Sequence, residues 1–235
     1  MFTEQVYVRV CHVKSGYKDR EDHIIKEFGR RGVPVNWCLD HDIADLSAED
    51  RQSSLRLAEI SLARKHIEIW QAFLATGFPF CLVFEDDVFL ARNFVPRLAD
   101  CLAELGPERK AVVYLGNGGN YYTPWVDLIK GKSLYPAKHS RCTDSYLLTR
   151  SAAAARCRWF NGRKFLAPID LEVNSSDHQT GTEILWFERP IVEQGTHNGR
   201  FATSISTGRR IPLWYKRLEW GWKKYRRMIF GHTAG

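Results

Sequence analysis

The chain has 235 residues and a formal net charge of +7, with 44% hydrophobic and 26% charged residues. This composition suits one α/β domain and excludes disorder along the whole chain. Residues 1–207 carry as many basic as acidic side chains, whereas residues 208–235 hold eight Lys or Arg and one acid, Glu219. A uniformly basic nucleic-acid-binding surface is therefore disfavoured, and no nucleic-acid partner is expected.

Two further features bear on the compartment. The apolar runs are too short to span a bilayer, and residues 1–6 lack the basic segment and long apolar stretch of a signal peptide. The six cysteines are scattered and form no C-x-x-C pair. The sequence therefore predicts a cytoplasmic protein with reduced thiols.

The chain opens with a strand–helix–strand pattern. Residues 5–10 predict a first strand, and the helical spacing of apolar residues over 17–31 predicts a helix that ends at Gly32. Residues 33–39 predict a second strand. This order is typical of a parallel βαβ unit.

A long helix and a buried strand follow. Ser47, with an acid three residues later, resembles a capping box and predicts a helix that runs to about Ala75. Residues 80–84 (F-C-L-V-F) form a continuous apolar run, which is typical of a central strand covered on both faces. This run ends abruptly in the acidic triplet Glu85-Asp86-Asp87.

The second half continues the alternation of strands and helices. Its predicted elements are a helix over 93–105, a strand over 111–115, a Gly/Asn loop over 116–120, a strand over 145–149, the start of a helix over 151–157, and strands within 183–192 on either side of Pro190. Such alternation predicts an α/β fold with a mostly parallel sheet and helices on both faces.

The acidic triplet is the clearest chemical signal. Alternate residues of an extended chain point the same way, so Glu85 and Asp87 can face one site. The carboxyl end of a parallel strand is where open α/β sheets bind their ligands. Carboxylate oxygens there suit Mg²⁺ or Mn²⁺ bound together with substrate phosphates, and a solvated acidic loop is the alternative. Neither a Walker A motif nor a G-x-G-x-x-G motif is present.

A family resemblance covers roughly residues 5–206. The block A-E-I-S-L-A-R-K-H-I-E-I-W (58–70), followed by C-L-V-F-E-D-D-V (81–88), resembles glycosyltransferase family 25, which includes bacterial lipooligosaccharide galactosyltransferases. Further matching motifs follow in the family's order, among them V-V-Y-L-G, T-D-S-Y-L-L-T-R-S-A-A, P-I-D and R-P-I-V-E-Q. The chain departs from the family pattern at Lys65, where Ser usually precedes the motif His, and at the Cys11-His12-Val13-Lys14 turn, which is usually rich in Asn and Asp.

The resemblance implies a GT-A fold, which is a Rossmann-like nucleotide-sugar-binding domain. It also implies a UDP-hexose donor, most often UDP-galactose, and inverting transfer to a glycan or glycolipid such as lipooligosaccharide. Two rival functions fit the same residues. One is a metal-dependent phosphohydrolase that uses the acidic strand end, and the other is a degenerate glycosyltransferase that serves as a membrane adaptor or glycan-binding protein.

The resemblance also suggests metal and donor contacts. Asp87 is expected to coordinate Mn²⁺ or Mg²⁺, with Glu85 and Asp86 shaping the ligand shell and donor site. His197 could complete the shell, although an exposed loop histidine is the alternative. Arg20 is expected to contact the nucleotide unless it is a solvated helix charge.

Two further residues are assigned roles near the donor and acceptor. His66 is expected either to bind the donor or to position the acidic strand, and a packed structural histidine is the alternative. Asp170 is the candidate general base for the acceptor hydroxyl, with helix capping as its alternative. Glu172 and Asp177 compete with Asp170 for the same role.

The basic tail has its own pattern, so we expect a glycosyltransferase domain over 1–207 and a membrane-associating tail over 208–235. Trp and Tyr beside Lys and Arg suit the headgroup zone of an anionic membrane, which predicts a peripheral protein at the inner face of the cytoplasmic membrane. A helix docked on the domain and an RNA-binding tail are the alternatives. The predicted apolar face steps by three or four residues and comprises Ile211, Trp214, Leu218, Trp222, Tyr225 and Ile229.

Overall fold

The computed structural model describes residues 4–118, 121–196, 201 and 213–230. Its strands are β1 (Val6–Cys11), β2 (Trp37–Cys38), β3 (Phe80–Glu85), β4 (Val88–Leu90), β5 (Ala111–Tyr114), β6 (Leu134–Pro136), β7 (Ser145–Thr149), β8 (Glu183–Phe187) and β9 (Val192–Gln194). Its α-helices are α1 (Lys18–Gly29), α2 (Leu57–Leu74), α3 (Phe94–Leu105), α4 (Arg150–Phe160), α5 (Ile169–Thr180) and α6 (Leu213–Phe230).

The described part of the chain holds one large sheet, with strand order β2-β1-β3-β7-β5-β8-β6, and a separate ribbon of β4 and β9. Strands β1, β2, β3, β5 and β8 run in one direction, whereas β7 and β6 run against their neighbours. The predicted α/β fold is therefore confirmed, but the sheet is mixed rather than mostly parallel, because three of its six strand pairings, those made by β7 and β6, are antiparallel. Because β7 lies between β3 and β5, its first residues are neighbours of the acidic triplet.

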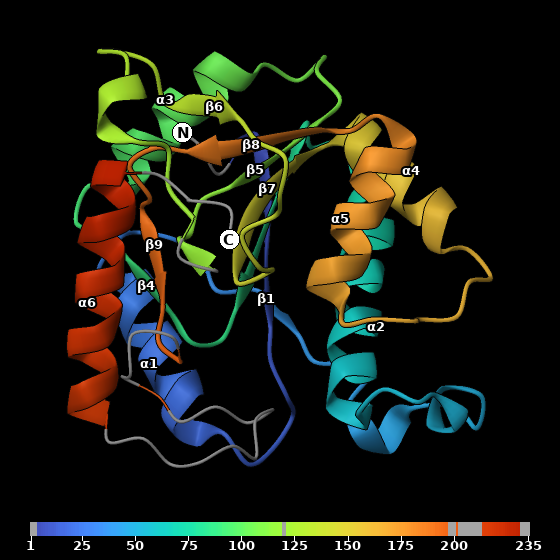
Figure 1. The fold of residues 1–235 in the computed structure, drawn as a ribbon. Coiled ribbons are helices and arrows are strands. Elements are labelled where there is room, and N and C mark those ends of the chain that lie inside the picture. Colours follow the sequence, from blue (N-terminus) through green and yellow to red (C-terminus); the bar gives the residue numbers. More distant parts are fainter. Residues whose placement is uncertain (1–3, 119–120, 197–200, 202–212, 231–235) are drawn as a thin grey trace.

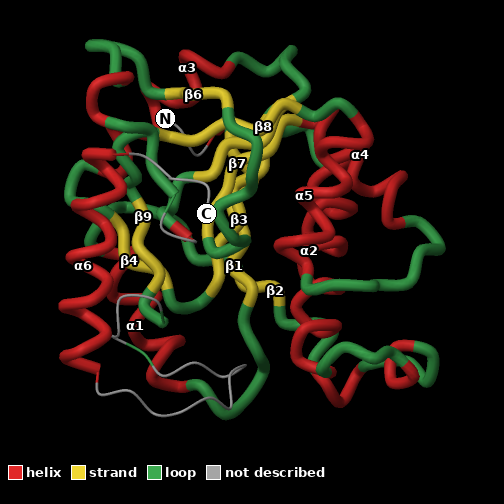
Figure 2. Tube along the Cα trace, in the orientation of Figure 1, coloured by secondary structure: helices red, strands yellow, loops and turns green. Residues whose placement is uncertain are grey.

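Helices cover both faces of the sheet (Figure 1). On one face, Phe80, Leu82 and Phe84 of β3 pack with apolar side chains of α1 and α3. On the other face, Cys81 and Val83 pack with α2, α4 and α5. Figure 2 shows the strands as a layer between these two groups of helices. The apolar run of β3 is thus buried on both sides, as its sequence predicts.

The predicted start of the long helix is wrong. Ser47 and Asp50 do form a capping pair, since Ser47 Oγ donates to Asp50 Oδ2 at 2.9 Å, but the pair belongs to a short 3₁₀ turn at Asp50–Gln52. Helix α2 begins only at Leu57. Arg64 of α2 donates to Asp50 at 2.6 Å, which folds the short turn back against the helix.

The second predicted strand is also shorter than expected, because β2 comprises only Trp37–Cys38 at the edge of the sheet. Several other predicted boundaries agree closely, whereas α5, β4 and β6 were not predicted. The strand predicted over 145–149 is β7 itself, and the helix predicted over 93–105 is α3.

Helix α6 lies beside the 3₁₀ turn η5 (Trp125–Asp127). Lys224 forms an ion pair of 2.8 Å with Glu193 of β9, and Met228 is buried. The helix therefore docks on the domain through one side, which was the alternative to membrane association in the sequence-based interpretation. None of the helices in the described ranges is both long and apolar enough to cross a bilayer.

Candidate active site

Polar side chains converge where β1, β3 and β5 end and β7 begins. Cys11 at the end of β1 is in register with Glu85 at the end of β3. The Glu85 N–H donates to the carbonyl of Asp144 at 2.9 Å, and the Leu115 N–H donates to the carbonyl of Ser145 at 3.1 Å. Segments from four different strands therefore meet at one edge of the sheet, where α/β folds bind ligands.

Asp86 links three elements at this edge. Its Oδ1 accepts a hydrogen bond from Arg20 Nη1 at 2.7 Å, and its Oδ2 lies 2.7 Å from His12 Nδ1. The Arg20 guanidinium carbon also lies 5.3 Å from the centre of the Tyr17 ring. Because both carboxylate oxygens are engaged, Asp86 fixes α1 and the end of β1 relative to β3.

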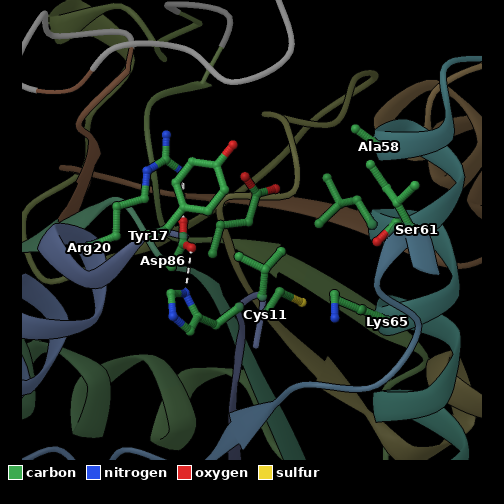
Figure 3. Close-up of a pocket in the computed structure, with 12 residues that line it drawn as sticks. Cys11, Tyr17, Arg20, Ala58, Ser61, Lys65 and Asp86 are labelled. Atoms are coloured by element: carbon green, nitrogen blue, oxygen red, sulfur yellow. Dashed lines mark hydrogen bonds and ion pairs between the residues drawn. The ribbon is translucent and has the colours of Figure 1, made fainter. Parts of the chain in front are cut away.

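A cavity of about 230 Å³ lies next to this group, between the end of β1 and helix α2. In Figure 3, Ser61 and Lys65 point from α2 toward the cavity, opposite Tyr17, Arg20 and Asp86. The walls combine apolar and charged side chains, as in small-molecule sites. The remaining lining residues include Cys11, His12, Ile43, Ala58, Leu62 and Glu85.

Lys65, the departure from the family pattern, is 2% exposed. Its Nζ donates to Asp42 Oδ1 at 2.8 Å and also to the carbonyl of Asp40. The neighbouring Ser61 Oγ donates to the carbonyl of His41 at 2.6 Å. Both side chains therefore attach α2 to the loop that follows β2, and Lys65 adds a cation to the cavity wall.

The two outer acids of the triplet have different surroundings. Glu85 Oε1 accepts from Thr143 Oγ1 at 2.9 Å, and its Oε2 accepts from Gln194 Nε2 at 3.4 Å. Asp87 Oδ2 accepts from both the backbone N–H and the hydroxyl of Thr196, at 3.1 and 2.6 Å. Asp87 Oδ1 is buried and has no partner within the described residues.

Asp144 is a third buried carboxylate at this edge, and sequence reasoning missed it. Its Oδ2 accepts from Ser145 Oγ at 2.9 Å. Burial raises the pKa of Asp144 to about 7 against the effect of that hydrogen bond, and the charge of Asp87 adds to the rise. Burial also raises the pKa of Glu85 well above its usual range, with contributions from Asp87 and Asp144. Asp144 is the second residue of the family-like motif T-D-S-Y-L-L-T-R-S-A-A, but a lone acid before a strand resembles a turn residue and does not by itself indicate a ligand.

The residues present fit a divalent cation in part. Asp87 Oδ1 and Asp144 Oδ1 are both buried acceptors without a partner in the described chain. Mg²⁺ and Mn²⁺ sites in nucleotide enzymes often use one or two carboxylates together with substrate phosphates. In the described ranges, no three His, Cys, Asp or Glu side chains form a ready ligand set. His197, the predicted additional ligand, lies outside the described residues.

His66 lies in the core between α2 and the sheet. It is completely buried, and its Nδ1 lies 2.7 Å from the hydroxyl of Tyr146 on β7, which also accepts from Trp70 Nε1 at 2.9 Å. Burial, and then the charge of Arg156, lower the pKa of His66 to about 3. Since β7 pairs with β3, this placement supports the positioning role rather than direct donor contact.

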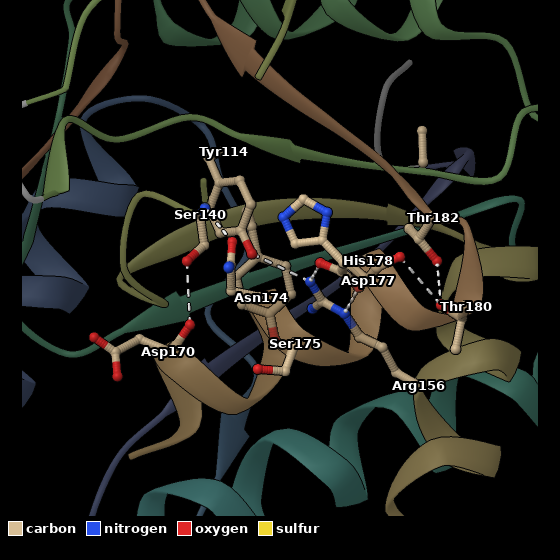
Figure 4. A network of polar contacts seen from close by, with 12 residues as sticks. Tyr114, Ser140, Arg156, Asp170, Asn174, Ser175, Asp177, His178, Thr180 and Thr182 are labelled. Carbon is tan, nitrogen blue, oxygen red and sulfur yellow. Dashed lines mark hydrogen bonds and ion pairs between the residues drawn. The ribbon is translucent and has the colours of Figure 1, made fainter. Parts of the chain in front are cut away.

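The three candidate bases all lie on α5, and Figure 4 shows two of them, Asp170 and Asp177. Asp170 is in the first turn and partly exposed, and its Oδ1 accepts from the Leu171 N–H at 3.0 Å. Glu172 caps the preceding loop through two backbone N–H groups. Asp177 is fully buried and paired with Arg156 at 2.6 Å. Since α5 leads directly into the amino end of β8, its first turn lies toward the same edge as the acidic triplet.

The comparison with protein families agrees with this geometry. Residues 15–156, more than half of the chain, match the profile of "Glycosyltransferase family 25 (LPS biosynthesis protein)". The chain belongs to glycosyltransferase family 25. The family description connects its members with glycosyl transfer and with lipopolysaccharide (LPS) biosynthesis.

Individual relatives of this family 25 protein are distant. A predicted glycosyltransferase of Haemophilus influenzae is 24% identical over 168 residues, which span 66% of this chain and 57% of that protein. Among solved structures, GalNAc-T7, crystallised with UDP, GalNAc and Mn²⁺, aligns with a TM-score of 0.51 and 12% identity over 96% of this chain and 49% of that one. A glycosyltransferase involved in glycosylation of the major capsid of PBCV-1 aligns with a TM-score of 0.51 and 9% identity, over 92% of this chain and 98% of that one. These likenesses confirm the predicted GT-A fold.

Proposed function

We propose that this family 25 enzyme transfers a hexose, most simply galactose, from a UDP-sugar to a hydroxyl of lipooligosaccharide or a related glycan. The observation that carries the proposal is the cavity beside β1, whose wall includes Glu85 and Asp86 of the acidic triplet. A site for a nucleoside next to a site for a metal-bound diphosphate is what a UDP-sugar requires.

The donor would lie with its nucleoside end in the cavity. Tyr17 offers an aromatic surface there, and Lys65 and Arg20 offer cations on opposite walls. The diphosphate would reach the end of β3, where Asp87 would hold Mn²⁺ or Mg²⁺. When bound, such a cation neutralises the charge that develops on the leaving diphosphate.

The acceptor side of the proposal depends on Asp170. Its carboxylate would take the proton from the acceptor hydroxyl while the hydroxyl oxygen forms a bond to the anomeric carbon. The bond from that carbon to the diphosphate oxygen breaks on the opposite face, and UDP leaves. The configuration at the anomeric carbon of the product is therefore inverted. The placement of Asp170 in the first turn of α5, partly exposed, supports this role over Asp177, which is buried against Arg156.

The first experiment is a thermal-shift screen of UDP-sugars with and without Mn²⁺. A ligand that binds the native state raises its apparent stability, so UDP-galactose with Mn²⁺ should raise the Tm more than UDP-galactose alone. Asp87→Asn should then lower kcat by at least about 100-fold, which is typical for the loss of one preorganised electrostatic group. The Asn side chain keeps one oxygen for Thr196, so the variant should stay folded.

Three outcomes would contradict the proposal. Full transfer activity in Asp87→Asn would remove the metal assignment. Hydrolysis of a phosphoester without any sugar acceptor would support the phosphohydrolase instead. Failure of the wild-type chain to bind any nucleotide or metal would support an adaptor that has lost catalysis.

We also propose that α6 holds the enzyme at the inner face of the cytoplasmic membrane. The helix docks through Met228 and Lys224, yet Leu218, Trp222 and Tyr225 are 66, 71 and 61% exposed. Docking and membrane contact are therefore compatible, because they use different sides of the helix. Aromatic side chains next to lysines and arginines favour the headgroup zone of an anionic leaflet.

A further inference from the structure

Four buried oxygens at the edge of the sheet have no hydrogen-bond donor within the described chain. Each of them can only accept, and they come from the segments that follow β3 and β5, precede β7 and end β9. The four atoms are Asp87 Oδ1, Asp144 Oδ1, Asn117 Oδ1 and Gln194 Oε1. A buried acceptor without a partner is destabilising, and a group of such acceptors points to a cation or a donor that the chain itself does not supply.

The backbone holds these segments side by side. The Glu85 N–H donates to Asp144 O at 2.9 Å, and the Gly195 N–H donates to Asp87 O at 2.7 Å. Gln194 donates its amide N–H to Glu85, so its oxygen is turned away from that carboxylate. The group is therefore assembled by the sheet and by the β4–β9 ribbon.

The Asp144 carboxylate is fixed in one place. Ser145 Oγ donates to its Oδ2, and Gly116 lies so close that a Cβ on residue 116 would be 2.3 Å from the same oxygen. Asn117, in the same loop, donates its own amide to the Tyr122 hydroxyl at 2.8 Å. Oδ1 is thus the oxygen of Asp144 that stays available to a ligand.

The nearby cation does not neutralise Asp144 by a hydrogen bond. Arg141 is fully buried, but its Nη2 pairs with Glu188, and its Nη1 donates to the carbonyls of Gly116 and Phe187. Asp144 and Asp87 therefore repel one another in a buried setting. A bound divalent cation would remove that repulsion and would use both free oxygens.

We propose that Asp144 is a second carboxylate ligand of the divalent cation, which it holds together with Asp87. Glu85 serves as a positioning residue, because both of its oxygens already accept hydrogen bonds from Thr143 and Gln194. The remaining coordination comes from the donor diphosphate and water, as is usual for Mg²⁺ and Mn²⁺. This inference rests on the proposed nucleotide-sugar function.

The test compares Mn²⁺ binding by the full-length wild type, Asp144→Asn and Asp50→Asn, with and without saturating UDP. Electron paramagnetic resonance of free Mn²⁺ gives the Kd directly. Loss of even an outer-shell partner weakens metal affinity about 10- to 100-fold, so Asp144→Asn should raise the Kd by at least about tenfold. Asp50→Asn removes a carboxylate that pairs with Arg64 away from the site, and it should bind Mn²⁺ like the wild type.

A second readout is the Tm of the metal-free proteins. Asp144→Asn removes a buried like-charge contact but keeps an oxygen for Ser145, so its metal-free Tm should equal or exceed the wild-type value. Mn²⁺ should then raise the Tm of the wild type clearly more than that of Asp144→Asn. If Asp144→Asn does not fold, Asp144→Ala gives the same comparison.

The outcomes separate the two proposals. Wild-type affinity for Mn²⁺ in Asp144→Asn, or no Mn²⁺ binding by the wild type, overturns the role of Asp144. If the wild type binds UDP with Mn²⁺ but Asp144→Asn does so equally well, only this inference fails. If the wild type binds Mn²⁺ through Asp144 but never binds UDP, the proposed function fails and the metal site stands.

Discussion

Asp86 and Asp87 are adjacent in sequence, yet the fold gives their carboxylates different tasks. Asp86 directs both oxygens to Arg20 and His12, so it holds α1 and β1 against the end of β3. Asp87 uses one oxygen for Thr196, and its other oxygen is buried and has no partner among the described residues. Both residues lie in the turn between β3 and β4, which directs Asp86 toward α1 and Asp87 toward the loop after β9.

His66 illustrates how burial changes a side chain. Its pKa falls from 6.5 to about 3, so below about pH 6.5 the unfolded chain binds a proton that the folded protein does not accept. The free energy of unfolding therefore falls as the pH drops from about 6.5 toward 3, by up to about 1.4 kcal/mol per unit. Above about pH 6.5, His66 is neutral in both the folded and the unfolded chain, so its burial no longer makes the free energy of unfolding depend on pH.

We predict that lowering the pH from about 7.5 to about 5 reduces the free energy of unfolding of the wild type by about 2 kcal/mol more than that of His66→Gln. Urea unfolding at the two pH values measures the difference. The Gln amide can still reach the Tyr146 hydroxyl, so the variant should fold. His178→Gln is the matched control, because His178 is exposed on α5, and it should follow the wild type. Equal losses in the wild type and His66→Gln would contradict the prediction.

Helices α4 and α5 are joined by one buried ion pair. Arg156 donates to both carboxylate oxygens of Asp177, at 2.9 and 2.6 Å, and also to the Tyr114 hydroxyl of β5 at 3.2 Å (Figure 4). Both charged side chains are completely buried. This pair sets the position of α5 and hence of Asp170 in its first turn.

Arg156→Met should lower the free energy of unfolding by about 3–5 kcal/mol, since it leaves the Asp177 charge buried and unpaired. Replacing both partners, as Arg156→Met with Asp177→Leu, should recover most of that loss. The comparison pair is Arg109 with Glu183, which is solvent-accessible. Arg109→Met should lower the free energy of unfolding by less than about 1 kcal/mol. Urea unfolding of the four proteins measures these values, and a small effect of Arg156→Met alone would refute the argument.

At the scale of the whole molecule, residues 1–207 are neutral and the C-terminal segment that contains α6 is cationic. The net charge of +7 belongs to residues 208–235, and α6 presents Leu218, Trp222, Tyr225 and Ile229 to solvent. Of the predicted apolar face, Ile211 and the side chain of Trp214 lie outside the described residues. An exposed apolar stripe beside basic residues is typical of helices that lie in a membrane interface.

We predict that Trp222→Ser with Tyr225→Ser lowers binding to anionic vesicles by about tenfold or more, because each aromatic side chain contributes roughly 1.5–3 kcal/mol when it leaves water. Vesicle sedimentation measures the change. Stability should be unaffected, since both side chains are exposed. Leu171→Ser, at an exposed apolar position on α5, is the control, and binding by the double variant equal to that of the control would exclude this role for α6.

The sequence alone predicted the α/β class, the buried strand β3, the bounds of α3 and β7, and the acidic triplet at the end of β3, but it did not predict α5. These features depend on local periodicity and on the order of motifs, both of which can be read directly from the sequence. It misplaced the start of α2, because the capping pair Ser47 and Asp50 has the same sequence signature at a short turn as at a helix.

Three-dimensional packing alone brought Asp144 to the acidic triplet. A five-residue apolar strand carries no signal of its direction, so the antiparallel insertion of β7 between β3 and β5 could not be deduced. The same applies to the outward face of α6, since an amphipathic pattern defines a stripe but not which side packs on the domain. Contacts between residues distant in the chain are set by the global fit of all elements, and no short segment contains that information.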